Sequence, residues 1–348
     1  MRIIFIINDI KTEKDNYTTI RLARRALKDR HRVALISLVD LTYQTSGEIT
    51  GAASIPLGND YKDDAELLEE LQDPRQKKVH ISLTKVDVIL LRADPAEELA
   101  MRPWAPSSSL LFAQLAVKAG VIVLNDPYHL TDASNKTYYQ QYPAFIRPRT
   151  CISRDPNEIK RFIEQENGKA VIKPLQGSGG HGVFLINETS GNNINQIIEA
   201  TIRYGYAIVQ EYIPQAAEGD LRLITLNGKP LKVNGVYACF KRFNETEDMR
   251  SNITAGGSIE LSEPTQDALE IARIIGPQLK HDGMYLSGLD IVGDKMIEVN
   301  VDTPGGINMA EDLTGEDFSG AIINDLQRKV DLRNHYRGYL RNREIAIM

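Results

Sequence analysis

Two carboxylates and one amide, Asp290, Glu298 and Asn300, lie in two apolar segments near the end of the chain. Residues two apart in a strand point to the same face, so Glu298 and Asn300 share a face, and Asp290 can face them across a turn at Gly293 and Asp294. Oxygen donors of this kind suit Mg²⁺, which keeps further positions for substrate phosphates. The alternative is a solvated strand face. Because "SGLDIVG" and "MIEVNVDTP" are otherwise apolar, partly desolvated polar groups favour the metal site.

A second candidate is the segment "KPLQGSGGHGVFLI" at 173–186, where a lysine, a serine and four glycines separate two apolar segments. One interpretation is a flexible hairpin, because glycine clusters usually mark turns. The other is a lid whose backbone N–H groups surround a polyphosphate, with Lys173 entering from the preceding strand. Neither G-x-x-x-x-G-K-[ST] nor a G-x-G-x-x-G that opens a helix is present. The loop by itself leaves both interpretations open.

The elements that position these residues follow two different patterns. Up to residue 125, short apolar segments rich in β-branched residues alternate with helical patterns, which predicts βαβ units and a parallel sheet. The predicted strands are 2–8, 32–41, 86–92 and 121–125, and the predicted helices are 18–30 and 107–120. We therefore expect an α/β, Rossmann-like domain over 1–125. It lacks a glycine fingerprint after its first strand, so no dinucleotide is assigned to it.

Antiparallel hairpins dominate from residue 126 onward, so this part is expected to be α+β. Strands should flank the glycine-rich loop, and two-residue turns are predicted at Asn227–Gly228 and at Gly293–Asp294. We divide this part into a lid subdomain, a subdomain with the metal site and a helical tail, at 126–206, 207–330 and 331–348. In the tail, Leu332, Tyr336 and Leu340 recur every four residues, which predicts a helix packed on the body or on a second subunit.

Composition narrows the class of partner. With 348 residues, 42% hydrophobic and 25% charged, the chain is ordinary for a globular protein. A formal charge of −6 argues against a surface that coats nucleic acid. No apolar segment has the length of a membrane span, and the N-terminus does not resemble a signal peptide. We expect a cytoplasmic protein with small-molecule partners, whose Cys151 and Cys239 are reduced thiols.

Several segments, in this order, resemble the bacterial glutathione synthetases of the ATP-grasp superfamily over about residues 1–328: "NDIKTEKDNYTTIRLARRALKDRHRV", "SNKTYY", "VIKPLQGSGGHGVFLI", "VQEYIP", "GDLRLITLNGKP", "SNITAGG" and "IGPQLKHDGMYLSGLDIVGDKMIEVNV". The resemblance implies an ATP-grasp fold with a glycine-rich lid. It also implies a homo-oligomer that joins γ-glutamylcysteine to glycine with ATP, through an acyl phosphate. Another ATP-grasp peptide or amino-acid ligase is the alternative, and a nucleotide-binding regulatory protein without turnover is an alternative of another class.

The same resemblance implies roles for individual residues. It places Lys173 and Arg222 at the phosphoryl centre and Arg92 of "RADP" near the peptide substrate. It makes Asp290, Glu298 and Asn300 the ligands of two Mg²⁺ ions, for which Mn²⁺ can substitute. The residues that it assigns to ATP are Lys136, Lys173, Gly177, Ser178, Gly179, Gly180, Gln210, Glu211, Tyr212, Ile213 and Asp220.

Two departures from the family concern the substrates. Tyr237 stands where a second substrate arginine is expected, and the segment "CFKRFNETEDMRSN" is longer than its counterpart, so Arg242 or Arg250 is the candidate replacement. The turn after the metal strand reads "NVDTPGGIN" rather than a Thr/Ser-Pro-Thr type. The resemblance therefore leaves the identity of the carboxylate and the amine open.

Overall fold

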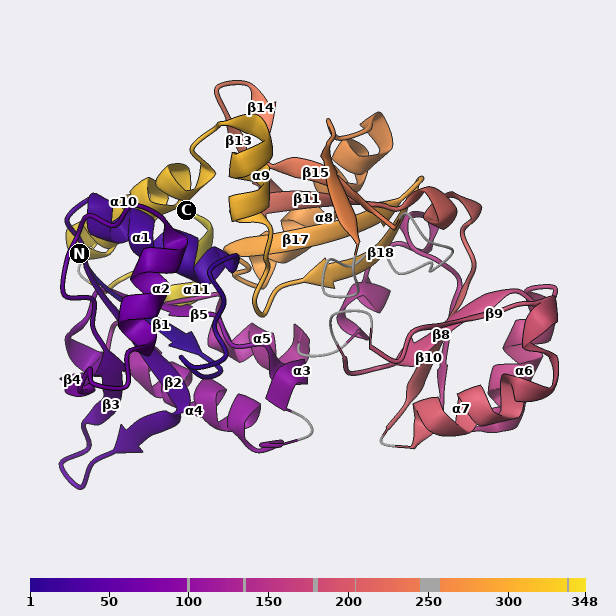
Figure 1. The fold of residues 1–348 in the computed structure, drawn as a ribbon, viewed down its shortest axis with the longest axis horizontal. Helices are drawn as coiled ribbons and strands as arrows, with labels where there is room; N and C mark the ends of the chain where they lie inside the picture. The colour runs from indigo at the N-terminus through magenta and orange to yellow at the C-terminus, as the bar shows by residue number, and fades with distance from the viewer. Residues whose placement is uncertain (99–100, 134–135, 178–180, 204, 245–256, 337) are drawn as a thin grey trace.

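The computed structural model describes the chain except for residues 99–100, 134–135, 178–180, 204, 245–256 and 337 (Figure 1). Three larger sheets follow one another along the longest axis of the molecule (Figure 1). Within the described ranges, no helix combines the length and the apolar character that crossing a bilayer requires. The expected thiols are confirmed, because Cys239 is buried, Cys151 is partly buried and both are free.

The N-terminal sheet has six strands in the order β4-β3-β2-β1-β5-β6. The pairs β1·β2, β1·β5 and β5·β6 are parallel, as predicted. β3 pairs with β2 and β4 pairs with β3, both in antiparallel fashion, which the sequence patterns did not indicate. The description of this unit as Rossmann-like stays a prediction. The strands are β1 (Arg2–Ile7), β2 (Arg32–Tyr43), β3 (Ile49–Ser54), β4 (Val79–Ser82), β5 (Val88–Leu91) and β6 (Ile122–Leu124).

Both faces of this sheet are covered by helices, which explains why β1 reads as an unbroken apolar segment. Ile4 and Ile6 belong to the core that includes α4 (Ala105–Lys118), whereas Phe5 belongs to the core of α1 (Thr18–Lys28) and α10 (Phe318–Tyr336). The helices and 3₁₀ helices of this part are α1 (Thr18–Lys28), α2 (Asp64–Gln72), η1 (Leu83–Lys85), α3 (Pro95–Glu98), α4 (Ala105–Lys118), α5 (Pro127–Ala133), η2 (Tyr138–Gln141) and η3 (Ala144–Ile146).

The second sheet lies at the end of the molecule opposite the N-terminal sheet (Figure 1). It is antiparallel with the order β7-β10-β8-β9, so the predicted hairpin around the glycine-rich loop is confirmed. Helices α6 and α7 cover one face with a small core of their own. The elements are β7 (Thr150–Ser153), α6 (Pro156–Gln165), β8 (Ala170–Pro174), β9 (Phe184–Ile186), η4 (Glu188–Asn193), α7 (Ile194–Ile202) and β10 (Ala207–Glu211).

The third sheet, with the order β16-β15-β11-β17-β18, lies between the other two. Both predicted two-residue turns are confirmed, and Asn227, Gly228 and Gly293 have the positive φ of 53°, 67° and 57° that such turns need. The elements are η5 (Pro214–Glu218), β11 (Asp220–Leu226), β12 (Lys229–Pro230), β13 (Lys232–Val233), β14 (Val236–Tyr237), β15 (Cys239–Phe243), β16 (Ser258–Leu261), α8 (Gln266–His281), β17 (Leu286–Val292), β18 (Lys295–Asn300) and α9 (Ile307–Thr314).

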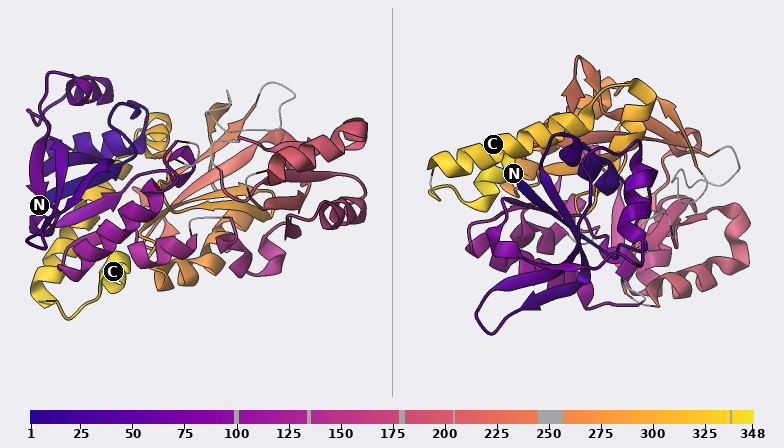
Figure 2. Two further views of the ribbon diagram at one scale, coloured as in Figure 1. Left: turned by 90° about the horizontal axis from the view of Figure 1, so that it is seen from below. Right: turned by 60° about the vertical axis from the view of Figure 1, so that its left-hand side comes forward.

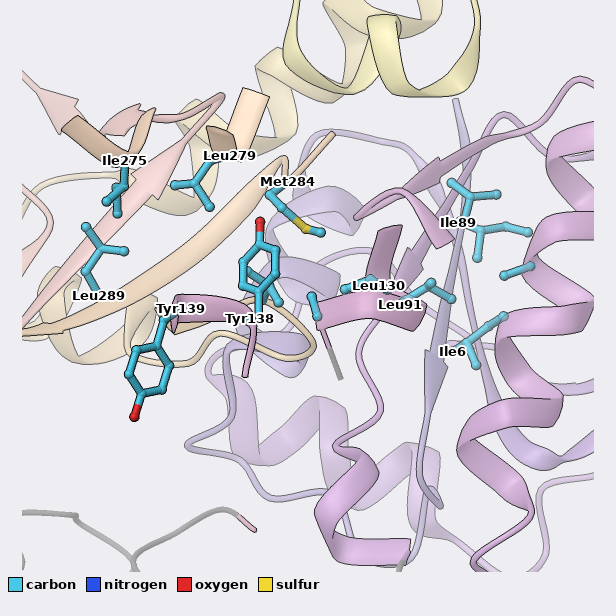
Figure 3. Close-up of a cluster of buried hydrophobic side chains, with 14 of the residues drawn as sticks. Ile6, Ile89, Leu91, Leu130, Tyr138, Tyr139, Ile275, Leu279, Met284 and Leu289 are labelled. Carbon is cyan, nitrogen blue, oxygen red and sulfur yellow. The ribbon is translucent and has the colours of Figure 1, made fainter. Parts of the chain in front are cut away.

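One hydrophobic core joins the third sheet to the N-terminal sheet. Leu279, Met284 and Leu289 belong to the same buried cluster as Leu91 and Leu130, with the buried ring of Tyr138 between the two groups (Figure 3). The N-terminal sheet and the third sheet are therefore parts of one packed body.

The C-terminal helix α10 (Phe318–Tyr336) packs against α1 of the N-terminal domain (Figure 2). The prediction that the tail packs on the body is confirmed. The prediction that Leu332, Tyr336 and Leu340 share one helix is wrong, because α10 ends at Tyr336 and α11 spans Asn342–Ile347. Gly338, with φ 84°, adopts the left-handed conformation that commonly ends a helix. The expected boundary at residue 331 falls inside α10.

Candidate active site

The three predicted metal ligands lie together on β17 and β18. Asp290 is directly opposite Glu298, and the amide Nδ2 of Asn300 donates to Asp290 Oδ2 over 3.2 Å. A β-bulge between Asp290 and Ile291 shifts the register, so that Ile291 pairs with Met296. The bulge leaves Met296 in the core and lets Glu298 share a face with Asp290.

Arginines from two neighbouring strands contact Asp290. Arg222 of β11 donates through Nε and Nη2 to the two carboxylate oxygens and through Nη1 to the Gly305 carbonyl over 3.0 Å. Arg242 of β15 lies 2.9 Å from Asp290 Oδ2 and also bonds Asp220. All four charged side chains are buried. Burial alone would raise the pKa of Asp290, but the two guanidinium groups outweigh it and hold that pKa below its ordinary value.

Because Arg242 is bonded to two buried carboxylates, its removal should destabilise the fold. We expect Arg242→Ala to lower the free energy of unfolding by about 3–5 kcal/mol, since Asp220 and Asp290 lose a buried counter-charge. Urea denaturation measures the change. Arg273→Ala, which breaks an exposed pair with Glu270, is the control and should lower it by less than about 1 kcal/mol.

Equal urea midpoints for Arg242→Ala and the wild type would contradict this assignment. The role of Arg242 in binding substrate stays a prediction.

Two lysines approach the same carboxylates from the side of the second sheet. In β8, Ala170 and Ile172 pack in the core with α6 and α7, so Lys173 points to the opposite face. Lys136 donates to the Gly177 carbonyl and its Nζ lies 3.7 Å from Glu298 Oε1. Burial, with a smaller contribution from Lys136, lowers the pKa of Lys173 to about 8, although Glu298 and Asp290 oppose the shift. Two cationic side chains beside the candidate metal ligands suit a polyphosphate.

The predicted nucleotide segment continues from the same face of the second sheet. Residue 208 of β10 pairs with Lys173, which places Gln210 two residues further along the face that carries Lys173. Gln210 is buried and donates to Thr150 Oγ1 over 3.1 Å. Glu211 bonds Arg149, Tyr212 has the ammonium of Lys169 4.0 Å from its ring centre, and Ile213 and Asp220 follow on either side of η5. The predicted residues Ser178, Gly179, Gly180 and Arg250 lie outside the described residues.

A cavity of about 590 Å³ opens next to these groups. Its polar side comprises Lys136, Gly177, Glu298, Asn300, Asp302 and Thr303. Its apolar side comes from β5, α4 and the segment that joins them, and includes Leu91, Ala93, Pro103, Pro106, Leu110 and Leu111. The cavity therefore connects the candidate phosphate and metal site to the N-terminal domain.

The structure does not place Arg92 with the other predicted residues. Leu91 and Ala93 line the cavity, whereas the Arg92 side chain is buried against Thr19 Oγ1, 3.3 Å away, and the Pro304 carbonyl, 3.0 Å away. Arg92 thus links the N-terminal sheet to the turn after β18. Its role in binding the peptide stays a prediction.

Tyr139 and Asp302 also line the cavity, although neither was among the predicted site residues. Tyr139 is fully buried and its hydroxyl has no hydrogen-bond partner among the described residues. Asp302 lies at the cavity wall with Asp94, and burial together with the charge of Asp94 raises the pKa of Asp302 to about 8. Asp302 lies in the departure "NVDTP" and Tyr139 ends the segment "SNKTYY", but no pattern in either stretch indicates a role for these two side chains.

The candidate ligands suit a divalent metal ion by their chemistry. Two carboxylates and an amide provide hard oxygen donors from adjacent strands. In the part of the chain that the structure describes, no cluster of three His, Cys, Asp or Glu side chains could hold a metal, so a site at β17 and β18 would depend on the Asn300 amide.

The chain has the ATP-grasp fold. It is similar to D-cycloserine synthetase DcsG, with a TM-score of 0.62 over 94% of this chain and 99% of that chain, at 12% sequence identity. It is also similar to a Chryseobacterium gregarium RiPP-associated ATP-grasp ligase, solved with ADP and a leader and core peptide. The TM-score is 0.59 over 94% and 97% of the two chains, at 16% identity. The predicted ATP-grasp fold is confirmed.

Sequence comparison defines the family more narrowly. Residues 1–131 match the model of the prokaryotic glutathione synthetase N-terminal domain, and residues 135–315 match that of the prokaryotic glutathione synthetase ATP-grasp domain. Glutathione synthetase of Shewanella oneidensis is 29% identical over 93% of this chain and 96% of the relative. Glutathione synthetase of Synechocystis sp. is 28% identical over 94% of this chain and all of the relative, and that of Vibrio vulnificus is 31% identical over 72% and 75%.

The chain belongs to the prokaryotic glutathione synthetase family. It is therefore an ATP-dependent ligase that forms a carbon–nitrogen bond between small-molecule substrates and uses ATP with a divalent metal ion. The recognition of the family from short sequence segments is confirmed.

Proposed function

We propose that the protein is a glutathione synthetase that joins γ-glutamylcysteine to glycine and converts ATP to ADP and phosphate. The observation that carries this proposal is the grouping of Lys136, Lys173 and Arg222 with the Asp290–Glu298–Asn300 set, in a chain of this family. Lys136, Glu298 and Asn300 of this group line the cavity. The site contains cations for phosphates and oxygen donors for a metal. The reaction that it supports is phosphoryl transfer to a carboxylate.

The chemistry needs no protein nucleophile. The cysteinyl carboxylate attacks the γ-phosphorus of ATP, the bond to the β-phosphate oxygen breaks, and ADP leaves. The neutral amine of glycine then attacks the acyl carbon, phosphate departs with its electron pair, and the nitrogen loses a proton to give the amide. Catalysis of this kind consists mainly of positioning and of charge neutralisation, which matches the residue types present.

Each predicted nucleotide, phosphate and metal residue has a role in this scheme. Lys136 and Lys173 hold the β- and γ-phosphates, and Arg222 lies beside the transferred phosphoryl group. Gln210, Glu211, Tyr212 and Ile213 hold adenine, Asp220 holds the ribose, and the loop 177–180 closes over the phosphates. Two Mg²⁺ ions, for which Mn²⁺ can substitute, would be held by Asp290, Glu298 and Asn300 and would neutralise the phosphate charge.

Three further parts of the proposal come from the sequence alone. The protein is a cytoplasmic homo-oligomer without nucleic-acid partners, its peptide substrate contacts Arg92 together with Arg242 or Arg250, and the chain divides into units at 1–125, 126–206 and 207–330, with a tail that continues α10.

Another carboxylate–amine ligase is the second candidate function, and the cavity favours it. Among the described residues that line the cavity, Lys136 is the only cationic side chain, whereas γ-glutamylcysteine carries two carboxylates. The wall formed by Pro106, Leu110 and Leu111 would suit an apolar substrate group.

A substrate assay distinguishes the two candidates. If the protein is a glutathione synthetase, ADP release requires γ-glutamylcysteine and glycine together, and the product has the mass of glutathione. Release of ADP with other carboxylates and amines, but not with this pair, would support the second candidate. Nucleotide binding without ADP release for any pair would indicate a regulatory protein.

A further inference from the structure

The carboxyl ends of β1 and β5 form a second place where charged groups meet. β1 lies between β2 and β5, so the strand order reverses there. In open α/β sheets, ligands commonly bind outside the carboxyl ends of the strands at such a reversal. The loop 8–17 follows β1, and Arg92 follows β5.

Glu13 in this loop is a buried residue, and one oxygen of its carboxylate accepts no hydrogen bond from the described residues. Glu13 is only 7% exposed, and its Oε2 has no hydrogen-bond partner among the described residues. The backbone around it is fixed, because Gln72 Nε2 donates to the carbonyls of Ile10 and Glu13 over 2.8 and 3.0 Å. A carboxylate held inside the protein without a donor is unfavourable for folding, which makes a functional role worth testing.

Asn308 of α9 provides a second unmet acceptor where the ATP-grasp part contacts the same loop. Its Nδ2 donates to the Asn16 carbonyl over 2.8 Å, while its buried Oδ1 has no donor among the described residues. The contact is fixed by Thr18, whose Oγ1 accepts from the backbone N–H groups of Gly306 and Ile307. The loop 8–17 and the helix α9 that contacts it therefore carry two buried oxygens, Glu13 Oε2 and Asn308 Oδ1, that have no donor among the described residues.

The surrounding charges favour a cationic donor. Burial raises the pKa of Glu13 to about 7, the positive charge of Arg92 opposes the shift, and Glu97 adds to it. Arg92 is buried and attracted by Glu13, but its hydrogen bonds go to Thr19 and Pro304 rather than to Glu13. A carboxylate and a guanidinium that are near each other without bonding match the ammonium and the carboxylate of an amino-acid head group.

We propose that Glu13 binds the α-ammonium of the γ-glutamyl residue, with Asn308 as a second acceptor and Arg92 facing the α-carboxylate. This inference rests on the proposed function. The γ-glutamyl head is the end of the dipeptide remote from the reacting cysteinyl carboxylate, and Glu13 belongs to the loop after β1 of the N-terminal sheet, whereas Lys173 and the candidate metal ligands lie on strands of the other two sheets. The acceptor amine does not suit Glu13, because it must be neutral when it attacks.

The test compares γ-glutamylcysteine with glutarylcysteine, which has the same carboxylates but no ammonium. We expect Glu13→Gln to raise the Michaelis constant for γ-glutamylcysteine by about 10- to 150-fold, the effect of losing one charge-assisted hydrogen bond. The Michaelis constants for glutarylcysteine, ATP and glycine should change less than about twofold. Asp64→Asn is the matched control, because Asp64 is a buried carboxylate of the same domain whose oxygens are bonded by Arg21 and Arg24. It should leave the ratio of the two peptide constants unchanged.

Equal changes for the two peptides, or no change for either, would overturn the assignment while leaving the proposed function intact. If the wild type forms no ADP with γ-glutamylcysteine and glycine, the proposed function fails, and the assignment fails with it.

Stability provides a second readout that does not depend on turnover. The folded-state pKa of Glu13, about 7, lies above its ordinary value of 4.5, so the folded protein binds more protons between these values. The contribution of Glu13 to stability therefore falls as the pH rises from 4.5 to 7. Glu13→Gln should remove this fall and unfold at the same or a higher temperature at pH 7.5. A lower unfolding temperature would show that Glu13 has a structural role instead.

Discussion

Replacing Glu298 with glutamine is expected to lower kcat by about 10²- to 10³-fold while the fold remains intact. Glu298 provides one of two carboxylates in the candidate metal set, and it pairs across the strands with Asp290. The substitution keeps the size of the side chain but removes a charge that would hold the metal against the phosphates. Raising the Mg²⁺ concentration should restore part of the activity, and calorimetry in the presence of ATP should show weaker Mg²⁺ binding.

The matched control is Glu260→Gln in β16 of the same sheet, where the carboxylate is exposed and lies 3.4 Å from Lys241. This variant should retain the activity of the wild type. If Glu298→Gln is as active as the wild type at low Mg²⁺, Glu298 is not a metal ligand.

Replacing Lys173 with methionine is expected to have a comparable effect on the use of ATP. We expect kcat/KM for ATP to fall by about 10²- to 10³-fold, because a buried cation aimed at the phosphates is lost. Since burial lowers the pKa of Lys173 to about 8, kcat/KM for ATP in the wild type should fall as the pH rises through about 8. Lys173→Met should lack this decrease.

Lys173→Met should lower activity but should not lower the stability of the fold. The ordinary pKa of Lys173 is 10.5, so the charged form is disfavoured in the folded protein, and its unfavourable contribution is complete below pH 8. Lys173→Met should therefore unfold at the same or a higher temperature at pH 7. Lys160→Met, on α6 of the same subdomain, is the control and should change neither property. A Lys173→Met variant with normal kcat/KM for ATP would contradict the assignment.

The sequence predicted the hairpin of the metal site because local signals determine it. The glycine turn at Gly293 aligns β17 with β18, and alternation places Glu298 and Asn300 on one face. The sequence did not predict the bulge between Asp290 and Ile291. With the turn alone, residue 297 would oppose Asp290, and the bulge replaces it with Glu298. An extra residue in a strand leaves no signal in a pattern of alternating apolar residues.

The arginines around Asp290 show where local patterns stop being informative. Arg222 and Arg242 meet Asp290 because β11 pairs with both β15 and β17, strands that are far apart in the sequence. The same applies to Arg92, whose position is determined by its contact with the Pro304 turn of a different domain. Such contacts depend on the packing of the whole chain, so a sequence pattern identifies the residue types but not their partners.

The C-terminal helix illustrates a similar limit. Leu332, Tyr336 and Leu340 have helical spacing, but the buried face of α10 is formed earlier, by residues such as Phe318, Ile322 and Leu326. These residues pack in the core that includes β1 and α1. Periodicity therefore predicted the presence of a helix, whereas its ends and its buried face were determined by the surface on which it packs.

The most direct test of the central claim follows one oxygen atom. γ-Glutamylcysteine labelled with ¹⁸O in its cysteinyl carboxylate is incubated with the protein, ATP, Mg²⁺ and glycine, and the phosphate and the peptide are analysed by mass spectrometry. An acyl phosphate intermediate transfers one ¹⁸O to each phosphate released, with one glutathione formed for each ADP. Unlabelled phosphate, or AMP with pyrophosphate as the nucleotide products, would contradict the account.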